Sequence, residues 1–269
     1  MTVSELYIYP VKSLGGISLE SAEIEERGFR YDRRWMLVDD NNIFMTQREH
    51  PTMALLKVAI IEKALNIKYT PGADTALQVP LEPVEQLFTS VEVWSNKCKA
   101  QWVSKTADEW FSDILHTNCR LVYMPDESRR IVDIRYAHQK EITSFTDGYP
   151  FMMIGQASLD DLNSRMNVPL PMNRFRPNIV FTGGEPYEED LFENFNIGSN
   201  EFFGVKLSER CIVTTIDQQT GIKGKEPLTT LSRYRAKDNK IFFGQNLLHK
   251  GEGAIKIGDT ITVHRKREI

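Results

Sequence analysis

The chain has 269 residues, enough for one large domain or two modest ones, each with its own core. Hydrophobic residues make up 41% and charged residues 26%, which is typical of a globular protein. The formal net charge of −4 excludes a nucleic-acid binder that relies on a general basic field. The 33 lysines and arginines can still form a local basic pocket.

The three cysteines, Cys98, Cys119 and Cys211, have no close partner in sequence, which excludes a disulfide framework and a CxxC zinc site. The five histidines are scattered and form no metal-ligand spacing. No apolar run approaches the length of about 20 residues that crosses a bilayer, and the N-terminus does not resemble a signal peptide. We therefore expect a cytoplasmic protein that has no contact with membranes.

The first hundred residues are predicted to form mostly strands. Residues 17–24 alternate between apolar and polar with one slip in phase, which indicates a half-buried strand. Hairpins are predicted over 33–46, 55–69 and 90–103, because each contains two β-rich runs with a short polar break between them.

Helices are predicted after this region. Thr106 and Glu109 form a capping box, and Asn118 is a plausible end for that helix. Ser158 with Asp161 opens a second helix, and residues 226–235, with Pro227 in the first turn, open a third.

The C-terminal part returns to short strands, predicted over 177–183, 201–209, 211–217, 240–248 and 254–265. Many short strands with few helices predict a mainly β fold with some α (α+β), in which helices decorate a closed or nearly closed barrel. A domain boundary is predicted within residues 124–135, where charge is dense and the pattern is weak.

Several segments combine cations with turn residues. "YPVKSLGG" (9–16) carries Lys12 and Ser13 before two glycines, which suits a phosphate or, equally simply, a surface turn. Arg27, Arg30, Arg33 and Arg34 precede an apolar strand, where they either bind an anion or solubilise the strand end. Arg33 or Arg34 and Arg48 are expected to converge across the hairpin.

"MNRFRPNIVF" (172–181) places Arg174 and Arg176 on one face if the chain is extended, which implies an anionic ligand or a structural carboxylate. Cys211 is either a buried, inert thiol or a reactive one, because neighbouring Arg210 favours the thiolate that binds metals. No Ser-His-Asp order, HExxH or Rossmann glycine pattern is present.

Six segments, taken together and in order, resemble the MOSC family, which is related to the C-terminal domain of molybdenum cofactor sulfurase and includes amidoxime-reducing proteins. They are "YPVKSLGG", "GFRYDRRWMLVD", "TQRE", "DGYPFMMIGQASLDDLNSRM", "NRFRPNIVF" and "SERCIVTTIDQQTG". The resemblance implies an N-terminal MOSC β-barrel domain over 1–120 and a MOSC domain over 121–269.

The resemblance also implies roles for individual residues. Cys211 would ligate molybdenum beside the two dithiolene sulfurs of molybdopterin, a soft ligand for a metal already bound by sulfur. Lys12, Ser13 and Arg33 match the residues that hold the cofactor phosphate. The rest of the cofactor site would comprise Arg48, Asp147, Tyr149, Phe151, Arg174, Arg176, Asn178 and Arg210, with a small hydroxyl residue at the Tyr149 position in animal members.

The implied activity is the reduction of N-hydroxylated compounds, such as amidoximes, hydroxylamines and N-hydroxylated bases. The sequence contains neither the cysteine cluster of a ferredoxin-like domain nor a membrane anchor, so an external donor is expected: a flavin reductase, an iron–sulfur protein or a haem protein. The alternative is a non-redox carrier of the molybdenum cofactor or of sulfur. The family is also associated with pyridoxal phosphate binding, and a barrel that binds an unrelated phosphorylated ligand is a third possibility.

Overall fold

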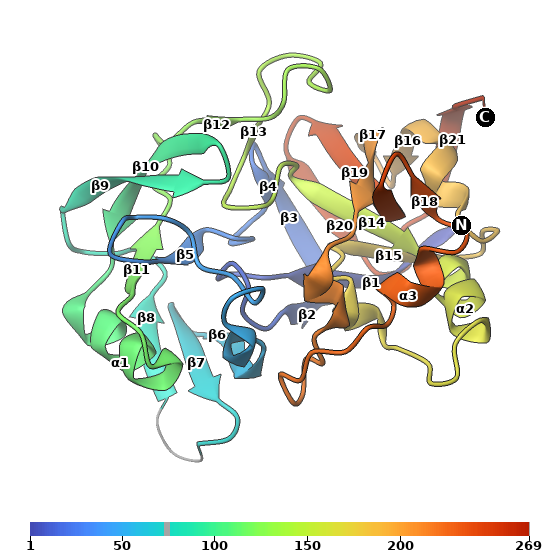
Figure 1. The fold of residues 1–269 in the computed structure, drawn as a ribbon. Helices are drawn as coiled ribbons and strands as arrows, with labels where there is room; N and C mark the ends of the chain where they lie inside the picture. The colour runs from blue at the N-terminus through green and yellow to red at the C-terminus, as the bar shows by residue number, and fades with distance from the viewer. Residues whose placement is uncertain (73–75, 269) are drawn as a thin grey trace.

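The computed structural model describes residues 1–72 and 76–268. Its largest sheet, at the right of Figure 1, curls until its ends meet. Thr2 forms a bridge with Thr260, and the Ile261 amide donates to the Met1 carbonyl at 2.9 Å, so the last strand returns to the first. The strand order is β2 (Ile17–Leu19), β1 (Thr2–Ile8), β15 (Ile179–Thr182), β14 (Phe151–Gly155), β19 (Lys240–Lys250), β17 (Asn200–Glu209), β16 (Phe192–Ile197) and β21 (Ile261–Lys266), and β18 (Ala236–Lys237) pairs with β19. The predicted mainly β fold class is confirmed.

The first strands of the chain pair with strands from its C-terminal half. β1 runs antiparallel to β15, and β3 (Ser21–Glu25) lies between β20 (Gly253–Lys256) and β4 (Gly28–Phe29). The slip predicted within residues 17–24 is the break between β2 and β3. Residues 1–29 therefore complete the C-terminal barrel, and the division into domains at residue 120 stays a prediction.

A second group of strands lies at the left of Figure 1. One sheet has the order β5 (Trp35–Val38), β11 (Arg120–Tyr123), β10 (Asn96–Trp102) and β9 (Phe88–Val93), and another contains β6 (Leu56–Ile61), β7 (Ala64–Tyr69) and β8 (Ala76–Pro80). The predicted hairpins over 55–69 and 90–103 are confirmed as β6–β7 and β9–β10. In the hairpin predicted over 33–46 only the first arm is a strand, because Ile43 and Phe44 make single bridges.

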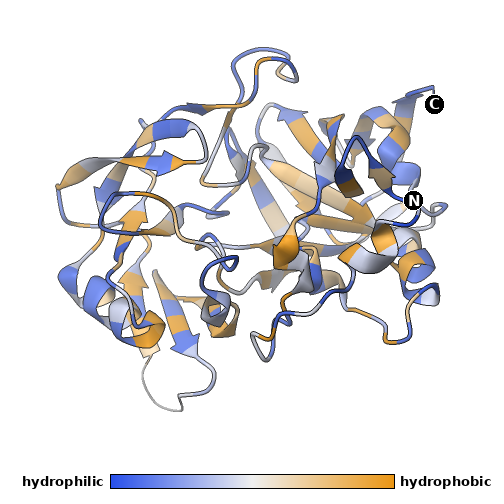
Figure 2. Cartoon of the chain, viewed as in Figure 1, coloured by the Kyte–Doolittle hydropathy of each residue, from blue (hydrophilic) through white to orange (hydrophobic). Residues whose placement is uncertain are grey.

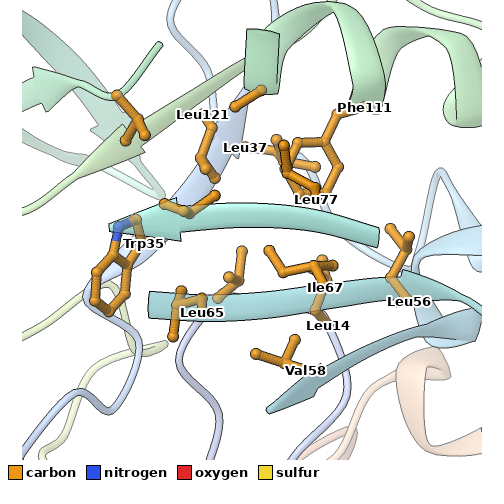
Figure 3. Packing of buried hydrophobic residues seen from close by; sticks show 14 of the residues in the cluster. Leu14, Trp35, Leu37, Leu56, Val58, Leu65, Ile67, Leu77, Phe111 and Leu121 are labelled. Atoms are coloured by element: carbon orange, nitrogen blue, oxygen red, sulfur yellow. The ribbon is translucent and has the colours of Figure 1, made fainter. Parts of the chain in front are cut away.

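The strands at the left enclose a core that also receives the apolar face of α1 (Lys105–Leu115). Figure 2 shows apolar and polar residues alternating along these strands and around α1. Phe111 and Leu121 meet Leu37 and Leu77 in Figure 3, and all are buried. Full burial of such a side chain contributes roughly 1.5–3 kcal/mol, so this core fixes the strands whose ends and turns reach the cavity described below.

Two helices begin at other residues than the pattern predicts. α1 is capped by Ser104, whose hydroxyl accepts from the Ala107 amide at 3.2 Å, so Thr106 lies inside the first turn. α1 ends at Leu115, before Asn118, and its C-cap His116 lies in the left-handed region. α2 (Gln156–Ser164) follows Gly155, so Ser158 lies within the helix.

The remaining elements are short. α3 (Leu228–Leu231) is a single turn directly after Pro227, shorter than the helix predicted over 226–235. The others are β12 (Arg130–Ile131), β13 (Ile142–Thr143), η1 (Pro51–Leu55), η2 (Met172–Arg174), η3 (Glu188–Leu191) and η4 (Ile212–Thr215). Across 1–72 and 76–268, no helix combines the length and apolar character that crossing a bilayer requires.

Candidate active site

One cavity of about 440 Å³ brings together residues from both halves of the chain. Seven cationic side chains but only two carboxylates line it, although the whole chain has a net charge of −4. All the site residues suggested by the sequence are among the lining residues: Lys12, Ser13, Arg33, Arg48, Asp147, Tyr149, Phe151, Arg174, Arg176, Asn178, Arg210 and Cys211. The cavity is therefore electropositive and suits an anionic ligand.

Lys12 is the most buried of the lysines that line the cavity. Its ammonium donates to the Phe145 carbonyl at 2.9 Å and to Asp147 Oδ1 at 2.7 Å. Burial lowers the pKa of Lys12 to about 8, although the Asp147 carboxylate opposes this shift. Lys12 therefore carries its charge at neutral pH and loses it in mildly alkaline solution.

The second of the two glycines after Lys12, Gly16, serves the packing of Tyr9. A Cβ at Gly16 would lie 2.5 Å from the Tyr9 ring, so only glycine fits beside it. Tyr9 is buried, and burial raises its pKa to about 12, so its hydroxyl stays protonated and donates to the Pro177 carbonyl at 3.1 Å. This close approach provides a role for the glycine that does not involve a phosphate.

The Tyr9 ring holds two guanidinium groups at the cavity. Arg33 and Arg176 lie over the ring, at 4.3 and 4.2 Å from its centroid. Arg33 also donates to Asp32 at 2.6 Å, to the Asn178 side-chain oxygen at 3.2 Å and to the Arg176 carbonyl at 3.3 Å. Burial lowers the pKa of Arg176 to about 10, which still leaves it protonated at neutral pH.

The prediction that Arg174 and Arg176 share one face of an extended chain is wrong. Residues 172–174 form the 3-10 turn η2, and Arg176 has a φ of 55°, in the left-handed region. Pro171 precedes this turn with extended backbone, and the Phe175 amide closes it on the Met172 carbonyl. The two arginines consequently contact different parts of the site.

Arg174 holds the turn that follows Cys211. Its buried guanidinium donates to the carbonyls of Thr214 at 3.1 Å and Thr215 at 3.3 Å, and to Asp217 Oδ2 at 3.0 Å. Desolvation by burial lowers the pKa of Arg174, while Asp217 opposes the shift. Arg174 thus positions the cysteine segment in addition to lining the cavity.

Cys211 is exposed and stands between the end of β17 and η4. The strand predicted over 211–217 is wrong, because residues 212–215 form a 3-10 turn. The hydroxyls of Thr214 and Thr215 donate to the carbonyls of Cys211 at 2.9 Å and Ile212 at 2.7 Å, so these β-branched residues satisfy a turn instead of a sheet.

The other two cysteines are buried, and burial raises the pKa of both Cys98 and Cys119, that of Cys119 to about 11. They therefore remain protonated thiols. Cys211 is the one exposed thiol of the three, and all three lie within the residues described.

Arg210 spans the barrel beside this thiol. It donates to the carbonyls of Phe243 at 2.7 Å and Phe175 at 3.1 Å, and its guanidinium lies over the Phe175 ring. Burial lowers the pKa of Arg210 to about 10, although the neighbouring Cys211 opposes the shift. Arg210 therefore places a positive charge beside the segment that carries Cys211.

Asn178 and Phe151 have structural contacts besides lining the cavity. The Asn178 side chain accepts from the Met152 amide and donates to the Tyr7 carbonyl, both at 3.2 Å, so it joins β14 to β1. The Phe151 ring is buried edge-on against Phe29, at 4.8 Å between centroids. Burial raises the pKa of Tyr149 above its ordinary value, so its hydroxyl is neutral at the cavity wall.

Of the two arginines expected to converge with Arg48, Arg33 lines the cavity and Arg34 does not. Arg34 donates instead to the Met124 carbonyl and to Asp126 at 2.6 Å. The cavity also contains residues that the sequence reasoning missed, among them Trp94, Lys206 and Glu209. The available signal for Trp94 was a bulky indole beside the break in the hairpin predicted over 90–103.

Within 1–72 and 76–268, no three His, Cys, Asp or Glu side chains converge as a metal site would require. Cys211 is the thiol that lines the cavity, and a thiol is the kind of ligand that a soft metal prefers. An exposed thiol beside several guanidinium groups has the chemistry to hold a sulfur-ligated metal attached to an anionic carrier.

Two family models match the chain: the MOSC N-terminal beta barrel domain over residues 1–118 and the MOSC domain over residues 140–262. Mitochondrial amidoxime-reducing component 1 from Mus musculus is 32% identical over 97% of this chain and 81% of its own length. The chain belongs to the MOSC family.

Other MOSC relatives agree with this assignment. The Homo sapiens amidoxime-reducing component 1 is 31% identical over 97% of this chain and 82% of its own length. Molybdenum cofactor sulfurase from Oryza sativa subsp. japonica is 30% identical over 90% of this chain, which spans 32% of that protein.

Proposed function

We propose that this MOSC protein binds molybdenum-molybdopterin and reduces N-hydroxylated compounds, such as amidoximes, hydroxylamines and N-hydroxylated bases. The observation that carries the proposal is the position of Cys211, an exposed thiol that lines an electropositive cavity. The names of the relatives, amidoxime-reducing components, support the choice of reaction.

The residues present fit this cofactor. Cys211 would ligate the metal, and Lys12, Ser13 and Arg33 would hold the phosphate by charge-assisted hydrogen bonds. The remaining lining residues that would hold the organic part are Arg48, Asp147, Tyr149, Phe151, Arg174, Arg176, Asn178 and Arg210. Pyridoxal phosphate would satisfy the same cations, but it leaves the exposed thiol without a role.

When bound, molybdenum supplies the two-electron chemistry that removes oxygen from nitrogen. The protein residues bind and orient. Tyr9 fixes the guanidinium groups of Arg33 and Arg176, which would face the anionic carrier. Arg174 fixes the turn after Cys211, so the thiol keeps its place at the cavity.

Electrons are proposed to come from a separate flavin reductase, iron–sulfur protein or haem protein. The described residues contain no cluster of three or more His, Cys, Asp or Glu side chains that would hold a metal. We also propose a cytoplasmic location, and the three free cysteines support a reducing compartment. Cell fractionation tests the location, since the relatives above are named as mitochondrial.

The reductase is tested by assaying molybdenum-loaded protein with a chemical electron donor and a hydroxylamine. Turnover is expected, and Cys211→Ser is expected to abolish it while the protein keeps its pterin. Absence of turnover, with both molybdenum and pterin confirmed in the wild-type protein, would rule out the reductase.

A second candidate is a carrier of the cofactor or of sulfur without redox turnover. The exposure of Cys211 favours it, because a persulfide needs an accessible sulfur, and one relative is named a molybdenum cofactor sulfurase. Mass spectrometry separates the candidates. A sulfur carrier shows the mass of an added sulfur on Cys211 in protein that contains no molybdenum, and a reductase does not.

A further inference from the structure

Trp94 occupies a position that neither backbone preference nor core packing explains. It lies in the turn between β9 and β10 with a φ of 57°, in the left-handed region that favours glycine or asparagine. It is 44% exposed, and none of the hydrophobic clusters within the described residues includes it. A large aromatic side chain kept at such a place is expected to meet a ligand.

The indole is nevertheless held in one orientation. Its N–H donates to Asp147 Oδ1 at 3.2 Å, and the Arg48 guanidinium lies over its ring at 4.3 Å. The Phe44 ring packs against it at 5.1 Å between centroids. These three contacts fix an exposed aromatic surface that lines the cavity.

Trp94 stands at the rim of the cavity, whereas Lys12, the cation that pairs with Asp147, lies inside. Lys12, which shares the Asp147 carboxylate with the indole, is 5% exposed, compared with 44% for Trp94. The indole is therefore accessible from solvent, unlike the ammonium of Lys12. Ring stacking on an oriented indole favours flat aromatic molecules over aliphatic ones.

We infer that Trp94, backed by Arg48, forms the aromatic wall of a substrate subsite and makes this protein prefer N-hydroxylated compounds that carry a planar aromatic ring. The inference rests on the proposed function and names the residue that sets its specificity. Arg48 adds a positive charge behind the indole, so a ring with an electron-rich face gains most from the pair.

The test compares benzamidoxime with acetamidoxime, which share the reacting group and differ in the ring. Trp94→Gly removes the indole and suits the left-handed backbone, so the variant is expected to fold. Trp94→Phe keeps a ring but loses the bond to Asp147. Phe88→Leu is the matched control, because Phe88 is an exposed aromatic of β9 with Lys99 over its ring at 3.9 Å and does not line the cavity.

Trp94→Gly is expected to lower the ratio of kcat/KM for benzamidoxime to that for acetamidoxime by about tenfold, the loss of one stacked aromatic contact. Trp94→Phe is expected to keep most of the ratio, and Phe88→Leu all of it. An unchanged ratio in Trp94→Gly would overturn the inference. So would loss of pterin from Trp94→Gly, since the indole would then hold the cofactor instead of the substrate.

Binding is measured alongside turnover, so that failure of the proposed function is distinguishable. Calorimetry on the molybdenum-loaded protein gives the Kd of benzamidoxime and of acetamidoxime without any electron donor. Tighter binding of benzamidoxime that disappears in Trp94→Gly supports the aromatic wall even if neither compound is reduced. Equal binding of both compounds by the wild-type protein contradicts it.

Discussion

Replacing Arg174 by alanine tests whether the turn that carries Cys211 is held by a distant segment of the chain. The buried guanidinium donates to the carbonyls of Thr214 and Thr215, which are themselves buried residues, and to Asp217. Each hydrogen bond from this charged donor to a threonine carbonyl contributes roughly 1.5–3 kcal/mol. The longer bond, to Thr215, is expected to contribute near the lower value. The Asp217 side chain is 43% exposed, so its ion pair adds only about 0–1 kcal/mol.

Arg174→Ala is therefore expected to lower the free energy of unfolding by about 3–5 kcal/mol, because it also leaves the Thr214 carbonyl without a donor, whereas the Thr215 carbonyl keeps its bond from the Gly224 amide. Urea unfolding at 25 °C measures the change. Arg165→Ala is the control, since Arg165 pairs with Asp161 on the surface of α2, and it should cost at most about 1 kcal/mol. A loss below about 1 kcal/mol for Arg174→Ala would refute the reasoning.

Three further changes test other parts of the site and core. Arg176→Ala is expected to weaken molybdopterin binding by about 1.5–3 kcal/mol, one charged hydrogen bond, and unchanged pterin content would remove Arg176 from the site. Burial raises the pKa of Glu189 from 4.5 to about 7, so its ionisation destabilises the fold increasingly between those two pH values. Glu189→Gln should then add about 3 kcal/mol to the free energy of unfolding at pH 8 and nothing near pH 4, and a gain that does not depend on pH in urea unfolding would argue against this. Because the pKa of Lys12 is about 8, the wild-type protein should bind inorganic phosphate more weakly as the pH rises from 7 to 9. Calorimetry measures this affinity, and Lys12→Met should show no such decline. An equal decline in both proteins would exclude Lys12 as the cause.

Local sequence pattern predicted two of the three hairpins correctly, β6–β7 and β9–β10. In β6 and β7 the residues alternate along each strand between the core and the surface, and the alternation is visible in the sequence. The slip within residues 17–24 likewise marked a real break between two strands. These features depend only on neighbouring residues, which is why reading the sequence locates them.

The errors arose where distant contacts decide the local structure. Residues 212–215 are β-branched and read as a strand, but two threonine hydroxyls and the guanidinium of Arg174 stabilise a turn there. Ser158 has the chemistry of a helix cap, yet its hydroxyl donates to buried Glu189 and accepts from the Tyr187 amide. No local pattern contains these partners.

The arginine-rich segment differs in the same way. Arg176 takes a left-handed backbone that places its guanidinium over Tyr9, which the chain supplies from the end of β1. Because β1 pairs with β15, the two segments meet only when the barrel forms. The gathering of the cations could be expected from a family resemblance, but their geometry could not.

The metal and pterin content of the protein, purified from a host that makes the molybdenum cofactor, tests the central claim most directly. The wild-type protein should contain molybdenum and pterin in amounts comparable to the chain, and Cys211→Ser should lose the metal while it keeps the pterin. Wild-type protein that contains neither, or a Cys211→Ser variant that holds as much molybdenum as the wild type, would contradict the account.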